Sequence, residues 1–128
     1  MINNPYESYR KTQIETAGPG RLLLMLYEGA LKNLRIAKES IEKKKINQAH
    51  NSLIKAQNII LQLNDDLNME LGGEIAQNLR NLYLYMYKRL IEANVQKNAD
   101  IVQETIDLLS ELKEAWDTII NKKTAVTP

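Results

Sequence analysis

The chain has 128 residues, the size of one domain and enough to bury about two-thirds of its unfolded surface. Its formal net charge of +1, from 17 basic and 16 acidic residues, argues against nucleic-acid binding, which needs a basic surface. It contains no cysteine, which excludes disulfide bonds and thiolate chemistry.

The first 18 residues form a polar arm. Tyr6, Tyr9 and Ile14 are spaced so that a short turn of helix places them on one apolar face. The start of the chain lacks the basic and apolar regions of a signal peptide, and the longest apolar run, residues 22–27, is far shorter than the ~20 residues that cross a bilayer. We therefore expect a cytosolic protein without membrane insertion.

Apolar residues at helical spacing predict two helices after the arm. The first is expected to begin near Pro19, a residue that suits the first helical position, and to end at the lysines 43–45. The second is expected from Asn47, as its N-cap, to about Leu71. The predicted core positions are Leu23, Leu26, Ala30, Leu34, Ala37 and Ile41, then Ala49, Leu53, Ala56, Ile60, Leu63 and Leu67. Apolar residues beside these stripes are expected to line grooves, namely Leu24, Leu31, Ile54 and Leu61.

The third predicted helix, Gly72 to Asn94, has more apolar residues than packing inside a bundle requires. Gly72 and Gly73 are expected to end the preceding helix. At about 100° per residue its apolar arc covers roughly 260°, whereas a bundle helix buries a stripe of roughly 100° or a little more. The expected core stripe is Ile75, Leu79, Leu82, Met86 and Ala93, and the expected outer set is Tyr83, Leu84, Tyr87 and Ile91.

A short polar link, Gln96 to Asn98, leads to the fourth predicted helix, with core positions Ile101, Thr105, Leu108, Leu112 and Ile119. Links this short make each helix run back along its predecessor. The sequence therefore predicts an all-α, antiparallel up-down-up-down four-helix bundle in one domain. Residues 1–18 form a helical or flexible arm, residues 19–122 the bundle and residues 123–128 a frayed tail.

The surplus apolar residues predict a partner-binding surface, for which the candidates are Ile54, Gln57, Leu61, Tyr83, Leu84, Tyr87 and Ile91. Tyrosine suits a surface that is alternately wet and covered. The single histidine, His50, has Asn47 three residues before it, which excludes the Glu-x-x-His pairs of di-metal bundles. Carboxylates are scattered over solvated positions. We expect no metal, no cofactor and no enzymatic activity.

Five segments in order resemble the family of the flagellar secretion chaperone FliS. They are NPYESYRKTQIETAGPG, LLLMLYEGALKNL, LIKAQNIILQLNDDLN, GGEIAQNLRNLYLYMYKRLIEAN and LLSELKEAW. The chain departs from the family pattern at Leu84, where an acidic residue is frequent.

This resemblance implies a non-enzymatic bundle that binds the disordered C-terminal segment of flagellin, with helical pieces of that segment in apolar grooves. It also implies prevention of premature polymerisation, and delivery to an export-gate component of the flagellar type III apparatus. The arm lies over the groove in the absence of flagellin in that family, so Tyr6, Tyr9 and Ile14 are predicted to form a removable lid.

Two other functions remain compatible with the pattern. Histidine phosphotransfer domains are four-helix bundles with a histidine on the second helix, but here the nearby lysine, Lys55, comes late and no glycine follows. A homo-oligomer would bury the surplus apolar surface against a second copy. We expect a monomer or a weak dimer.

Overall fold

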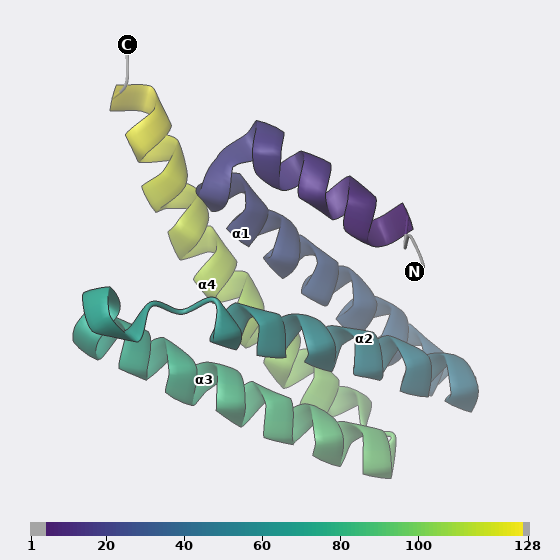
Figure 1. Cartoon of the computed structure of the whole chain (residues 1–128). Helices are drawn as coiled ribbons and strands as arrows, with labels where there is room; N and C mark the ends of the chain where they lie inside the picture. The colour runs from purple at the N-terminus through teal and green to yellow at the C-terminus, as the bar shows by residue number, and fades with distance from the viewer. Residues whose placement is uncertain (1–4, 127–128) are drawn as a thin grey trace.

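The computed structural model describes the backbone of residues 5–126 and the side chains of residues 19–121. This part of the chain forms α1 (Pro5–Glu42), α2 (Ile46–Asp65), α3 (Met69–Gln96) and α4 (Ala99–Val126). α1 packs against α2 and α4, and α3 packs against the same two helices (Figure 1). The predicted all-α four-helix bundle is confirmed.

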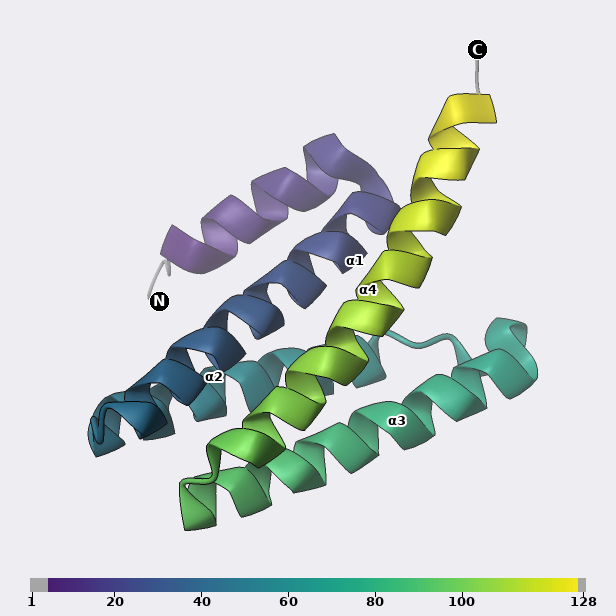
Figure 2. The same cartoon turned by 180° about the vertical axis from the view of Figure 1, so that it is seen from behind.

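The first helix begins earlier than predicted, at Pro5 instead of near Pro19. Pro19 lies inside α1, where its ring removes a backbone donor and disturbs the helical ladder. Figures 1 and 2 show α1 bent sharply in this part, so that its purple N-terminal segment turns back toward the end that leads to α2. The side chains of Tyr6, Tyr9 and Ile14 lie outside the described ones, and the lid stays a prediction.

The boundary between α2 and α3 also differs from the prediction. Lys45, not Asn47, is the N-cap residue of α2, and it makes no capping bond through its side chain. α2 ends at Asp65, and Asn68 starts α3 by accepting a hydrogen bond at Oδ1 from the backbone N–H of Leu71 at 3.0 Å. Gly73 has φ 52° and ψ −126° inside α3. It therefore marks a kink near the start of α3 instead of the end of α2.

The core follows the predicted stripes along most of α1 and α2. Two positions expected in grooves, Leu24 and Leu31, are instead buried, with exposed fractions of 3% and 4%. α4 packs against α1, and the side chain of Ile120 lies against Gly20, where an added Cβ atom would be 3.3 Å from Cγ1 of Ile120. The close approach of α4 explains how this side of α1 becomes core.

Ile75 differs in the opposite direction. It was expected in the core stripe of α3, yet its side chain is 70% exposed. α3 and α4 lie close together at the link between them and diverge toward the start of α3 (Figure 2). Ile75 therefore lies on the core-facing side of α3, but at a level of the bundle where α4 is too far away to cover it.

Candidate partner-binding face

The register of α2 against α3 brings most of the predicted partner-binding residues together. Nδ2 of Asn94 lies 2.9 Å from Nδ1 of His50, which fixes these two residues opposite each other. Antiparallel helices have the same rise per residue, so Gln57 lies level with Tyr87, and Leu61 lies level with Tyr83 and Leu84. The two helices therefore form one face here, with some of these positions on its surface and others beneath it.

Apolar side chains are exposed along this face. Ile54 of α2 and Ile91 of α3 are 39% and 43% exposed, and Leu61, Leu84 and Tyr87 are half-buried. We call this surface the α2–α3 strip; it consists of Ile54, Leu61, Leu84, Tyr87, Ile91 and Val95. Its α3 members are spaced by three, four and four residues, so they lie along one side of the helix.

The sequence pattern missed Val95, because the third helix was predicted to end at Asn94. Val95 is 81% exposed and lies inside α3, which continues to Gln96. The signal was present, since Val95 follows Ile91 by four residues and so extends the same side of the helix.

Tyr83 does not belong to this surface, and its assignment to the outer set was wrong. Its side chain is 1% exposed, and its hydroxyl is hydrogen-bonded to that of Tyr27 in α1. The indole Nε1–H of Trp116 in α4 donates to the same Tyr27 oxygen at 3.2 Å. Three helices are joined here, and the bonded hydroxyl allows a tyrosine to replace an aliphatic residue in the core.

Burial also changes the acidity of this pair of tyrosines. Removal from water raises the pKa of Tyr27 above its ordinary value, although the hydrogen bonds from Tyr83 and Trp116 oppose the rise. Burial raises the pKa of Tyr83 as well, and the neighbouring Tyr27 adds to that rise. Both hydroxyls are therefore neutral at ordinary pH.

Gln57 is the second predicted binding residue that the structure places inside. It is 5% exposed, and its Oε1 atom is buried without a hydrogen-bond partner. On α2 it falls about 40° from Leu53, which is within the width of a core stripe. Gln57 therefore lies beneath the α2–α3 strip and does not form part of its exposed surface.

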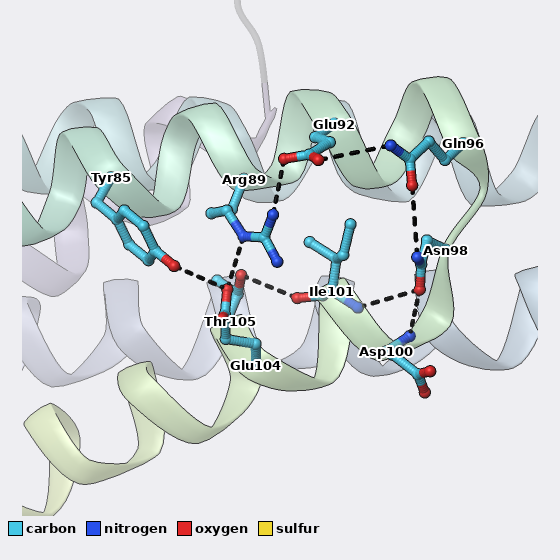
Figure 3. Close-up of polar contacts among 9 residues, drawn as sticks. All are labelled: Tyr85, Arg89, Glu92, Gln96, Asn98, Asp100, Ile101, Glu104 and Thr105. Atoms are coloured by element: carbon cyan, nitrogen blue, oxygen red, sulfur yellow. Dashed lines mark hydrogen bonds and ion pairs between the residues drawn. The ribbon is translucent and has the colours of Figure 1, made fainter.

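A polar cluster fixes the opposite side of α3 to α4 (Figure 3). The guanidinium of Arg89 donates to Glu104 at 2.8 Å and to Glu92 at 2.7 Å, and the Tyr85 hydroxyl donates to Glu104 at 3.2 Å. The hydrogen bond to Glu104 is the main reason that the pKa of Arg89 is raised. Asn98 caps α4 by accepting from the backbone N–H of Asp100 at 2.9 Å. These contacts hold α3 in place while the α2–α3 strip faces outward.

The side chains of residues 19–121 hold no group of three or more His, Cys, Asp or Glu residues placed to bind a metal ion. His50 is exposed, and one of its ring nitrogens is engaged by Asn94. Among the described residues, the exposed apolar strip is the candidate binding surface.

Comparison with known proteins places the chain in a family. A model of the family described as flagellar protein FliS matches residues 2–123. The chain belongs to the FliS family. A flagellar secretion chaperone FliS of Bacillus subtilis is 38% identical over 122 residues, which cover 95% of this chain and 90% of the relative.

Other FliS relatives are similar over comparable lengths. The flagellar secretion chaperone FliS of Salmonella typhimurium is 38% identical over 121 residues, covering 91% of this chain and 90% of the relative. That of Campylobacter jejuni is 34% identical over 125 residues, covering 97% and 98%. The predicted resemblance is confirmed, and the family role is that of a chaperone in flagellar secretion.

No helix within the described residues is both long enough and apolar enough to span a membrane.

Proposed function

We propose that this protein is a cytosolic export chaperone that binds the C-terminal segment of flagellin on the α2–α3 strip. The observation that carries the proposal is the apolar strip itself, with Ile54 and Ile91 exposed above a core that is already filled. A strip of this kind on a folded scaffold suits the apolar face of an amphipathic helix.

The proposed chaperone action rests on competition and on a limited affinity. A flagellin tail held on the strip is unavailable for pairing with other flagellins, so premature polymerisation is suppressed. Ordering the tail costs about 2–5 kcal/mol of the gross interaction energy, which keeps the complex reversible for delivery to the flagellar type III export gate. The protein acts as a monomer or weak dimer, and its arm, through Tyr6, Tyr9 and Ile14, acts as a removable lid over surplus apolar surface until flagellin arrives.

The proposal is tested by titrating a flagellin C-terminal segment into the wild type and into Ile54→Ser/Ile91→Ser. Both isoleucines are largely exposed, so the double variant should remain helical by circular dichroism. We expect its affinity to fall by at least about tenfold, because each change removes about 1 kcal/mol or more of apolar contact. Ile119→Ser is the control, since Ile119 is 49% exposed on α4, which carries no residue of the strip. Equal affinity of wild type and double variant would contradict the proposal.

Burial of the strip against a second copy is the alternative that the same exposed residues allow. Sedimentation distinguishes flagellin binding from self-association. A flagellin segment should produce a complex of one chaperone and one segment, whereas a dimer whose mass does not change on adding the segment favours self-association.

A further inference from the structure

A second surface lies on the opposite flank of α2, between α1 and α2. It is a groove of about 600 Å³ lined by Lys32, Asn33, Ile36, Lys55, Asn58 and Ile59, which we call the α1–α2 groove. On α2, Ile59 falls roughly 160° from Leu61 of the α2–α3 strip, and Lys55 falls roughly 100° from Ile54. The groove is therefore separate from the surface proposed for flagellin.

The groove has an apolar floor and a basic rim. Ile36 and Ile59 are half-buried, while Lys32 and Lys55 are exposed and form no ion pair with a side chain of residues 19–121. No carboxylate is among the described residues that line it. Asn33 donates through Nδ2 to the carbonyl of Gly29 at 2.9 Å, which leaves its Oδ1 available to accept a hydrogen bond.

Positive charge continues beyond the groove toward the α1–α2 link. An adjoining hollow shares Ile36 and is lined by two further lysines, Lys43 and Lys45. Glu39, the one carboxylate among its described lining residues, is paired with Lys43 at 2.6 Å. The whole chain has a net charge of only +1, so the excess of lysine is a local property of this flank.

We propose that the α1–α2 groove binds an acidic amphipathic segment of a partner protein, with carboxylates at Lys32 and Lys55 and aliphatic side chains on Ile36 and Ile59. Charge complementarity identifies the occupant. The groove's lining residues between 19 and 121 include neither arginine nor an aromatic side chain, which are the residues that bind phosphate bidentately and stack on bases. An acidic peptide therefore matches the groove better than a nucleic acid.

The test uses a fluorescein-labelled peptide with glutamates and leucines at helical spacing, measured by fluorescence anisotropy with the full chain. Lys55→Glu should weaken binding at least about tenfold, because it sets like charges against each other. Lys88→Glu, which makes the same change of charge at an exposed lysine of α3, should leave the affinity within about twofold. An analogue with glutamine in place of every glutamate should bind much more weakly than the parent peptide.

Four outcomes would overturn the proposal: no saturable binding, equal weakening by the two lysine variants, equal binding of the glutamine analogue, or displacement of the peptide by equimolar single-stranded DNA. Lys55→Glu should still bind the flagellin segment like the wild type. Loss of peptide binding in this variant is thereby distinguished from failure of the proposed flagellin site.

Discussion

At the scale of single residues, the buried hydroxyl groups decide where the tyrosines of α3 lie. Tyr83 and Tyr87 are one turn apart, and an apolar pattern alone does not tell which of them faces inward. The deciding contact is with Tyr27, 56 residues earlier in the chain. Sequence spacing fixes an angle on a helix, but it does not reveal a hydrogen-bond partner on another helix.

The hydrogen bonds among Tyr27, Tyr83 and Trp116 predict which of two tyrosine substitutions destabilises the protein more. Tyr83→Phe removes one hydroxyl, and Tyr27 keeps its bond from Trp116, so we expect a loss of about 0.5–1.5 kcal/mol in the free energy of unfolding. Tyr27→Phe leaves both the Tyr83 hydroxyl and the Trp116 indole without their shared partner, and should cost about 1–3 kcal/mol. Urea denaturation of both variants measures the difference. A larger loss for Tyr83→Phe would contradict the arrangement.

The same pair predicts a loss of stability in alkali. Burial raises the pKa of both hydroxyls in the folded protein, whereas in the unfolded chain they ionise near the ordinary value of about 10. Below that pH both tyrosines are neutral in the folded and the unfolded chain, and their contribution to the free energy of unfolding is fully present. As pH rises above it, the unfolded chain releases protons that the folded one keeps, so the free energy of unfolding falls. Denaturation at pH 8 and pH 11 should show a smaller fall for Tyr27→Phe/Tyr83→Phe than for the wild type.

At the scale of elements, the number, type and order of the helices were predictable, because each carries apolar residues at helical spacing. The residues at which the helices begin and end were less predictable. The pair Gly72–Gly73 suggested a helix end, but Asn68 supplies a side-chain cap earlier and the chain turns there. Likewise, the core angle of Ile75 was right, but its exposure depends on the divergence of α3 and α4, a property of packing that no single helix encodes.

The backbone conformation of Gly73, at the kink in α3, predicts the effect of a substitution there. Its φ of 52° with ψ of −126° disfavours any residue with a Cβ atom, although no other group would obstruct that atom. Gly73→Ala should therefore cost about 1–3 kcal/mol of unfolding free energy through backbone strain. Gly29→Ala is the matched control, because Gly29 lies within α1 and an added Cβ would make only ordinary contact with Ile59 at 3.4 Å. The control should be neutral or stabilising by up to about 1 kcal/mol, and thermal denaturation compares the two.

At the scale of the whole molecule, the core ties the four helices together while two flanks of α2 present different surfaces. One flank carries the apolar α2–α3 strip and the other the basic α1–α2 groove. Of the seven binding residues predicted from sequence, Tyr83 and Gln57 proved buried, while Ile54, Leu61, Leu84, Tyr87 and Ile91 share one outer face. The strip could be anticipated because its spacing is regular. The groove could not be anticipated, because its lysines and asparagines come from two helices and form one surface only when those helices are aligned.

The most direct measurement of the central claim is a methyl NMR titration of the isoleucine-labelled protein with a flagellin C-terminal segment. Resonances of Ile54 and Ile91 should shift or broaden in a saturable manner, because these methyl groups lie on the proposed strip. Those of Ile119, exposed on α4 outside the strip, and of Ile60, buried in the core, should move much less. Saturable binding that leaves Ile54 and Ile91 unchanged while perturbing other isoleucines would contradict the assignment of the flagellin site to the α2–α3 strip.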